Sequence, residues 1–428
     1  MNELKKKITS LISEYFENKN SEFVPGTTPI LTGMSVYDAN EVNAIIGSVL
    51  DGWFGLGKSG QEFENRFSAK VGKSHSVYVN SGSSANLLAL LGLKNKLGLS
   101  GGEIITTACT FPTTLNPIIQ LGFKPHFVDV DETLNITPES VSAAINKNTK
   151  GVMFAHTLGN PARVEEIVDI AKKNGLFVVE DCCDALGASY KGRACGTFGD
   201  VATFSFYPAH IITTGEGGMV STDDKALSRI TKSLRDWGRD CWCATDEKNP
   251  LGACGCRFDF KVDGVSYDHK YIYSQIGYNM KPLELQAAMG LKQLDRLDAF
   301  VRIRKRNFGI YSERFQRFKD HLSLPDVSNG ADPVFFGLPV TITNDRIDRT
   351  NLVRYLNDNK IATRYLFGGN TIRQPAYKGI EYASTGKLLR SDVLFHRFFW
   401  IGIHQGMDER MVTYVCDKFD EYIRKSYV

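Results

Sequence analysis

The 428-residue sequence lacks a run of apolar residues long enough to cross a membrane, which takes about 20 residues in a helix. The N-terminal stretch MNELKKKITSLISEYFENKN has lysines before apolar residues, but polar residues interrupt the run and no small-residue cleavage site follows. Its apolar residues recur at helical spacing, which predicts an amphipathic helix. We therefore expect a cytoplasmic protein without a membrane partner.

A strong charge of either sign is also missing. The formal net charge is +3, and lysine and arginine are scattered along the chain. This distribution excludes the basic stripe or face of a nucleic-acid-binding protein. A locally basic pocket for an anionic small molecule remains compatible with it.

The nine cysteines do not form the even set of a disulfide framework, and seven of them lie between residues 182 and 256. In a large chain without secretion signals, such clustering favours metal or redox chemistry. Three interpretations stay open: an iron–sulfur cluster, a structural zinc site built from two C-x-C pairs, or unligated thiols. We assign Cys109, Cys182, Cys195 and Cys416 to structural roles.

Short apolar runs alternate with amphipathic segments through the first half of the chain. Strands are predicted at 76–80, 103–108, 123–130, 150–156, 176–181, 201–206 and 217–222, with helices from Ser84, over 162–175 and over 224–238. This alternation is typical of an α/β fold with a mostly parallel sheet covered on both faces. Residues 239–270 are rich in Gly, Cys and Asp and have no periodicity, which predicts a long functional loop.

The length of the chain favours more than one domain. We expect an N-terminal helical segment at 1–34, a large domain at 35–295 and a smaller α+β domain at 296–428. A long helix from about Pro282 to Phe318 is predicted to join the two domains, and GLPVTI (337–342) is predicted as a strand of the smaller one.

Two motifs indicate a phosphorylated, nitrogen-containing cofactor. Gly82, Ser83 and Ser84 stand where a strand turns into a helix, so that backbone amides and the helix dipole can hold a phosphate; the same pattern also fits an ordinary serine helix cap. Asp181 ends the apolar run LFVVED, at the strand edge where α/β sheets bind ligands. A carboxylate there either pairs with a pyridinium nitrogen or caps the following turn.

Together, and in this order, these stretches resemble the DegT/DnrJ/EryC1/StrS sugar aminotransferase family, which has the fold-type I, aspartate aminotransferase-like fold of enzymes that use pyridoxal phosphate (PLP). The resemblance covers about residues 35–425 and includes TFPTT (110–114), VDVDETLNI (128–136), SFYPAH (205–210), GEGG (215–218) and GYNMKPLELQAA (277–288). It implies that Phe111 stacks on the cofactor ring, Asp181 holds the ring nitrogen and Ser205 contacts the phosphate. It also implies a homodimer in which Asn279 reaches the partner's phosphate site.

One position departs from the family. The residue five positions after the serine is a lysine that binds PLP covalently in the family, but here it is His210. Because imidazole forms no stable bond of that kind, we expect a noncovalent cofactor in its amine form, pyridoxamine phosphate (PMP). A histidine is suited to act as the base that removes a proton from the C4′ carbon of the cofactor. Loss of a neighbouring sugar hydroxyl would follow, so the expected reaction is a dehydration.

The spacing Cys183-x57-Cys241-x-Cys243 resembles the cluster-binding pattern of the iron–sulfur 3-dehydrases that act on CDP-4-keto-6-deoxy-glucose, within the same family. The resemblance implies a [2Fe–2S] cluster with four thiolate ligands. We assign Cys254 as the fourth ligand, with Cys256 as the alternative because the loop before them is longer than in those enzymes. No flavin or nicotinamide fingerprint is present, so a separate reductase is expected to deliver electrons.

The segment ATRYLFGGNTIRQPAY (362–377) resembles the one that lines the sugar-nucleotide site of those dehydrases. Arg364 and Arg373 are candidate diphosphate ligands, since guanidinium groups match phosphate oxygens; solvent-exposed arginines are the alternative.

The sequence therefore predicts a PMP- and [2Fe–2S]-dependent 3-dehydrase. Its expected substrate is a nucleotide-linked 4-keto-6-deoxyhexose, CDP-linked by resemblance, on the way to a 3,6-dideoxyhexose of bacterial surface polysaccharides. A cluster-free dehydratase with an amino donor and a noncatalytic binding protein are the alternatives. A true aminotransferase would need a lysine at position 210, and Lys191 and Lys232 lie elsewhere.

Overall fold

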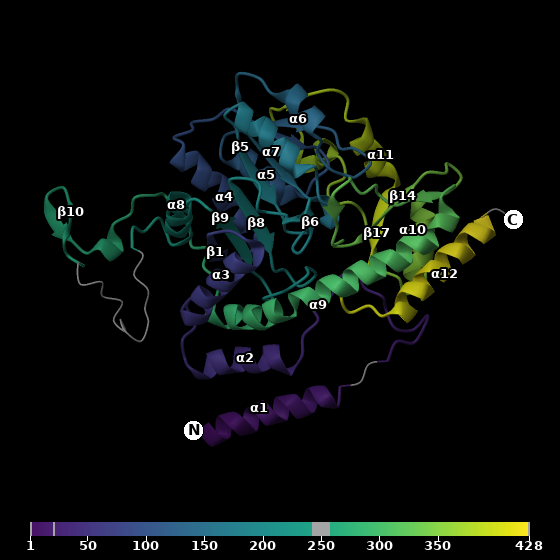
Figure 1. Ribbon diagram of the computed structural model, residues 1–428, viewed down its shortest axis with the longest axis horizontal. Helices are drawn as coiled ribbons and strands as arrows, with labels where there is room; N and C mark the ends of the chain where they lie inside the picture. The colour runs from purple at the N-terminus through teal and green to yellow at the C-terminus, as the bar shows by residue number, and fades with distance from the viewer. Residues whose placement is uncertain (1, 20–21, 242–256, 427–428) are drawn as a thin grey trace.

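An eight-stranded sheet forms the centre of the larger part of the molecule (Figure 1). The computed structural model describes residues 2–19, 22–241 and 257–426. The strand order is β1-β9-β8-β5-β4-β2-β3-β16, and β9 alone in this sheet runs against the other strands. Its strands are β1 (His75–Val79), β2 (Glu103–Thr107), β3 (Lys124–Val128), β4 (Thr149–Ala155), β5 (Phe177–Asp181), β8 (Val201–Ser205), β9 (Gly218–Thr222) and β16 (Ala383–Ser384). The expected mostly parallel sheet is confirmed.

Helices cover both faces of this sheet. On one face α4 (Gly82–Lys96), α5 (Pro112–Gln120) and α8 (Lys225–Arg235) share a core with alternate strand residues such as Val77 and Val79. On the other face lie α6 (Pro138–Ala144), α7 (Val164–Lys173), α3 (Lys58–Val71) and part of α9 (Glu284–Phe315). Because both faces are buried, the strands read as nearly continuous apolar runs.

A second core lies in the C-terminal part of the chain. It contains an antiparallel sheet of order β12-β14-β17-β15 and the helices around it. These elements are β12 (Leu322–Ser323), β14 (Leu338–Ile342), β15 (Thr363–Arg364), β17 (Phe398–Ile401), α10 (Arg349–Asp358), α11 (Leu389–Arg397) and α12 (Glu409–Ser426). Phe23 and Ile30 from the N-terminal segment are buried in this core, and Ile30 pairs with Ile361. The domain boundary at residue 295 stays a prediction, since α9 crosses it without a break.

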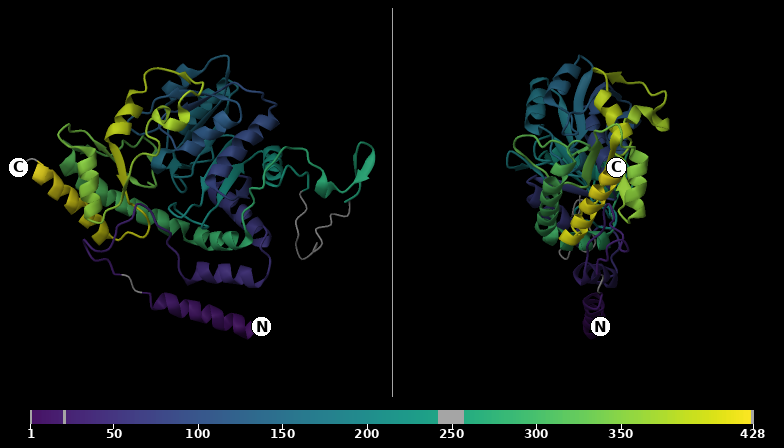
Figure 2. Two further views of the ribbon diagram at one scale, coloured as in Figure 1. Left: turned by 180° about the vertical axis from the view of Figure 1, so that it is seen from behind. Right: turned by 90° about the vertical axis from the view of Figure 1, so that its right-hand side faces the viewer.

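The predicted long helix is confirmed as α9, which runs from the large sheet to the second core (Figure 1). The predicted N-terminal helix is also confirmed, as α1 (Asn2–Glu17). It packs on α2 (Ala39–Leu50) and lies along one edge of the molecule (Figure 2). No helix in the described part of the chain is both long and apolar enough to span a membrane.

The cysteine-rich region contains more regular structure than its composition predicts. Strands β10 (Phe260–Val262) and β11 (Val265–Tyr267) form a hairpin within the expected loop. Their residues are exposed, so no burial pattern marks them in the sequence. Elsewhere in the described residues, β6 (Ser189–Tyr190), β7 (Arg193–Ala194) and β13 (Ala331–Asp332) form a small three-stranded sheet. The predicted cluster ligands Cys243 and Cys254, and the alternative Cys256, lie outside the described residues.

Candidate active site

A cavity of about 970 Å³ opens at the carboxyl ends of β5 and β8, where ligands of α/β sheets bind. It brings together most of the residues predicted from the sequence: Gly82, Ser83, Phe111, Asp181, Cys183, Ser205, His210 and Arg364. The second core supplies one wall through residues such as Phe336, Asn357 and Trp400. Thr32 and Gly33, from the N-terminal segment, line it as well.

The N-terminus of α4 lies at one end of the cavity. Ser81 is the helix cap: its Oγ accepts a hydrogen bond from the Ser84 N–H at 3.1 Å, and the two hydroxyls lie 3.0 Å apart. This cap engages Ser84, whereas Gly82 and Ser83 line the cavity. A Cβ atom on Gly82 would come within 2.6 Å of the Cβ of Ser205. Glycine is therefore required where the helix meets β8.

Asp181 is held by three donors at the end of β5. Its Oδ2 accepts from the Asn86 side chain at 2.8 Å and from the Thr114 hydroxyl at 2.7 Å, and its Oδ1 accepts from the Cys183 N–H at 3.0 Å. The carboxylate is 4% exposed and fixed in orientation at the cavity wall. Asn86 and Thr114 were not predicted, although Asn86 follows Gly82 by one helical turn and Thr114 lies in the TFPTT motif.

His210 lies in the turn after β8, with its imidazole against the ring of Phe336 at a centroid distance of 4.8 Å. Its side chain is 12% exposed. Burial, together with the positive charge of Arg304, lowers the pKa of His210 to about 3. The imidazole is thus in its neutral form at physiological pH.

Asp184 is a cavity residue that sequence reasoning missed. Burial and the nearby charge of Asp181 raise its pKa to about 8, which favours the neutral carboxylic acid at pH 7. Its position three residues after Asp181 in EDCCDA is a usable signal, since that turn leaves the sheet at the ligand-binding edge. Tyr207 also lines the cavity, half-exposed beside His210.

Two of the remaining predicted residues lie elsewhere. Arg373 forms a two-point ion pair with Asp392, at 2.6 and 2.7 Å, and is not among the cavity residues. Asn279 is exposed, accepts a hydrogen bond from Lys281 at 2.7 Å and lies outside the cavity of its own chain. The structure describes two of the cysteines predicted as cluster ligands. Cys183 lines the cavity and Cys241 does not.

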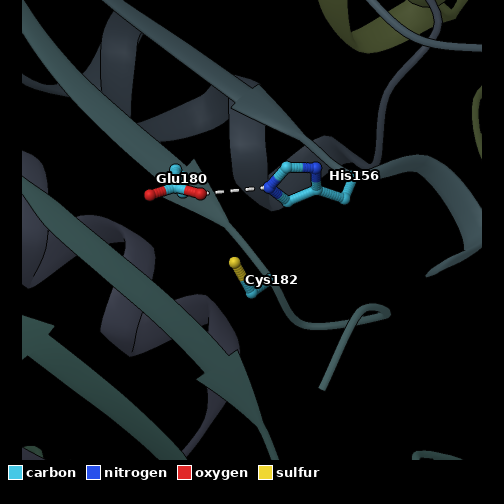
Figure 3. Close-up of side chains that lie close together, drawn as sticks. All are labelled: His156, Glu180 and Cys182. Atoms are coloured by element: carbon cyan, nitrogen blue, oxygen red, sulfur yellow. Dashed lines mark hydrogen bonds and ion pairs between the residues drawn. The ribbon is translucent and has the colours of Figure 1, made fainter. Parts of the chain in front are cut away.

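A group of metal-ligand residue types, His156, Glu180 and Cys182, is buried beside the cavity and has a structural role (Figure 3). His156 Nδ1 accepts from the Ala162 N–H at 3.1 Å, which leaves Nε2 to donate to Glu180 at 3.2 Å. The Glu180 carboxylate also accepts three backbone N–H groups, from Gly196, Phe198 and Gly199. The ring nitrogens and both carboxylate oxygens are therefore engaged in fixing the loop after β7.

Comparisons with known proteins agree with this architecture. The chain is 43% identical over 432 residues to the lipopolysaccharide biosynthesis protein RfbH of Salmonella typhimurium, with 98% of each chain covered. It is also 43% identical over 432 residues to the dTDP-4-dehydro-2,6-dideoxy-D-glucose 3-dehydratase of Saccharopolyspora spinosa, covering 99% of this chain and 93% of that one.

Solved structures show the same fold. The E. coli GDP-4-keto-6-deoxy-D-mannose-3-dehydratase with bound hydrated PLP is 30% identical, with a TM-score of 0.81, and covers 91% of this chain and 98% of its own. A structure of GDP-4-keto-6-deoxymannose-3-dehydratase holds a trapped PLP-glutamate geminal diamine; it is 29% identical with a TM-score of 0.81, covering 91% of this chain and 99% of that one. The expected fold-type I architecture is confirmed. With residues 36–420 matching the model of that family, the chain belongs to the DegT/DnrJ/EryC1/StrS aminotransferase family.

Proposed function

We propose that this chain is a PMP-dependent 3-dehydrase that removes the C3 hydroxyl of a nucleotide-linked 4-keto-6-deoxyhexose, with electrons supplied through a [2Fe–2S] cluster by a separate reductase. The observation that carries the proposal is the presence of a buried, neutral His210 at the family's lysine position, in the same cavity as Asp181. The product belongs to 3,6-dideoxyhexose biosynthesis. The names of relatives that are 3-dehydratases of nucleotide sugars support the reaction.

The cavity residues fit a phosphorylated pyridine. Gly82 and Ser83 at the N-terminus of α4 line the cavity beside Ser205, which supports a phosphate site there. Asp181, fixed by its three donors, is placed to pair with a protonated ring nitrogen. Phe111 is half-exposed in the cavity and offers a ring face for stacking.

When bound, PMP supplies an amine that condenses with the sugar ketone and a ring that accepts the electron pair released at C4′. His210 takes the C4′ proton, because its neutral imidazole has a free lone pair at physiological pH. Asp181 stabilises the positive charge on the ring nitrogen and so favours that proton transfer. The hydroxyl on the carbon next to the former ketone then leaves.

After the hydroxyl leaves, release of the deoxysugar would require two electrons, two protons and a water that hydrolyses the link to the cofactor amine. A [2Fe–2S] cluster held by this chain would supply the electrons one at a time from the reductase. Cys183 is a cavity residue and adjoins the Asp181 turn, which suits a cluster ligand close to the cofactor. Cys241, Cys243 and Cys254 complete the proposed set of four thiolates.

The substrate end of the cavity contains Arg364, the candidate for diphosphate binding. A volume of about 970 Å³ suits a cofactor and the sugar end of a substrate together. Arg373, which is paired with Asp392, is the weaker candidate. We propose CDP as the nucleotide, and the names of the relatives make dTDP and GDP the comparisons in a substrate panel.

The proposed homodimer would complete the site. Asn279 lies on a surface with large exposed apolar side chains, among them Ile276 at 95% exposure and Tyr278 at 41%. Trp53 and Phe54 are also exposed, and the Phe54 carbonyl accepts from the N–H that starts α9. Apolar exposure of this kind supports an interface between subunits, across which Asn279 would reach the partner's phosphate site.

The second candidate is a cluster-free dehydratase that regenerates PMP with an amino donor. It is favoured by the related 3-dehydratase whose structure holds glutamate trapped on its cofactor. The two candidates differ in iron content and in their dependence on a reductase or on glutamate.

The deciding experiment is electron paramagnetic resonance of anaerobically purified, dithionite-reduced protein, together with its iron content. The proposal requires about two irons and about one spin per chain, with turnover that depends on a reductase and not on glutamate. Iron-free, silent protein that turns over with glutamate would establish the second candidate instead.

A further inference from the structure

Arg304 is a fully buried arginine in the middle of α9 whose hydrogen bonds reach groups that pack against the turn of His210. Its Nη1 donates to the carbonyl oxygens of Phe335 and Phe336, both at 3.0 Å, and its Nε donates to Gln405 Oε1 at 2.9 Å. These three acceptors are neutral. Burial lowers the pKa of Arg304 to about 9, against the opposing attraction of Asp184, so these hydrogen bonds hold a guanidinium that is unfavourable to bury.

The side chain of Gln405 links Arg304 to the turn that carries His210. Its Nε2 lies 3.2 Å from the Ile211 carbonyl oxygen and 3.5 Å from that of His210, and donates to both. Gln405 is itself 5% exposed. The donor group of Gln405 thus faces the backbone of the His210 turn while its acceptor is fixed by Arg304.

The second link from Arg304 to His210 runs through Phe336. Arg304 holds the backbone oxygen of Phe336, and the ring of Phe336 packs against the imidazole of His210 at 4.8 Å and 40°. Arg304 is therefore linked to the His210 turn in two ways, through the side chain of Gln405 and through the backbone of Phe336. Both links start from α9, which joins the two cores.

We propose that Arg304 and Gln405 are positioning residues that hold His210 in the orientation needed for proton transfer. The inference rests on the proposed role of His210 as the base. Gln405→Leu removes both contacts of the amide at similar side-chain length, and Arg304→Lys keeps the positive charge but loses the fork that reaches several acceptors. Asn307→Leu is the matched control, since Asn307 is buried one turn further along α9 and bonds to Met407 rather than Gln405.

The experiment measures the rate of C4′ proton exchange in D₂O with PMP and substrate, its KM and the Kd for PMP. We expect Gln405→Leu and Arg304→Lys to lower kcat for exchange about 10- to 100-fold, as for a misplaced catalytic group, with KM and Kd within about twofold of wild type. Asn307→Leu should keep the wild-type kcat. Wild-type kcat in both variants, or an equal loss in the control, would overturn the proposal.

A readout without cofactor separates this inference from the proposed function. Protein labelled at histidine Cε1 gives eight histidine signals, and His210→Asn identifies that of His210. Gln405→Leu should shift or broaden this signal in the cofactor-free protein, whereas Asn307→Leu should leave it unchanged. An unmoved signal in both Gln405→Leu and Arg304→Lys overturns the positioning role. If His210→Asn keeps the exchange activity, the assigned base is wrong even where the signal moves.

Discussion

The Nδ1 atom of His210 lies 3.7 Å from the nearest carboxylate oxygen of Asp184, which is too long for a hydrogen bond. The imidazole is buried beside a carboxylic acid that is largely neutral at pH 7, and the positive charge of Arg304 lies nearby. Neither neighbour stabilises a protonated ring. The arrangement favours the base form of His210 before a substrate arrives.

The rate of C4′ proton exchange at acidic pH should depend on these surroundings of His210. An ordinary histidine loses its base form as the pH falls through about 6.5, but the pKa of His210 is lowered to about 3 by burial and by Arg304. We expect the C4′ exchange rate to stay within about twofold between pH 5 and 7 and to fall to half only near pH 3. The measurement is kcat for exchange against pH at saturating PMP and substrate. A midpoint near 6.5 would show that His210 titrates as if it were exposed.

Asp181→Asn should separate cofactor binding from catalysis. The amide keeps the shape of the carboxylate but cannot balance a protonated ring nitrogen, so we expect exchange to fall about 10²- to 10³-fold, as for loss of one electrostatic contact in an active site. Asp223→Asn, which weakens the ion pair between the exposed Asp223 and the buried Lys73 and lies outside the cavity, is the control and should keep the wild-type rate. Equal rates in the two variants would remove Asp181 from the cofactor site.

Gly82→Ala tests the close approach of α4 to β8. The new methyl group would lie 2.6 Å from the Cβ of Ser205 and 3.0 Å from the thiol of Cys183. We expect a loss of about 1–3 kcal/mol in the free energy of unfolding, as for overpacking, and a weaker Kd for PMP. Gly47→Ala, on α2, meets no atom within 4 Å and should stabilise the protein by about 1 kcal/mol. Thermal unfolding with and without PMP measures both effects, and an unchanged Kd in Gly82→Ala would contradict the assigned phosphate site.

Cys241→Ala should remove the iron centre and keep the dehydration half-reaction. The matched control is Cys416→Ala, because Cys416 is buried in the second core with the residues around α12 and has no proposed ligand role. Iron analysis and C4′ exchange measure the two properties in the same preparation. Full iron content in Cys241→Ala would remove Cys241 from the ligand set.

The large sheet and the cofactor end of the site could be predicted because their signals are local. Asp181 ends a strand that begins with an apolar run, and Gly82 begins a helix shortly after a strand ends, so sequence order alone places both at one edge of the sheet. His210 was found because it replaces a lysine in a motif that resembles a known family. In each of these cases the informative residues are neighbours along the chain.

Contacts between distant segments carry no comparable signal. Phe336 packs on His210 across 126 positions of sequence, and Gln405 contacts the same turn across 195 positions. The burial of Phe23 and Ile30 in the C-terminal core was missed for the same reason. They are separate apolar residues in an irregular segment, so no periodicity marks them. Arg373 shows the opposite error, because sequence cannot show that a nearby Asp392 already binds the guanidinium.

The unbroken course of α9 has a mechanical consequence. Its 32 residues contain no proline, and its side chains enter both cores, with Leu294 and Phe300 in one and Tyr311 and Phe315 in the other. A hinge between the cores would have to bend this helix, and sharp bends arise at prolines or local breaks. We therefore expect the helix to act as a strut that limits the motion of one core relative to the other.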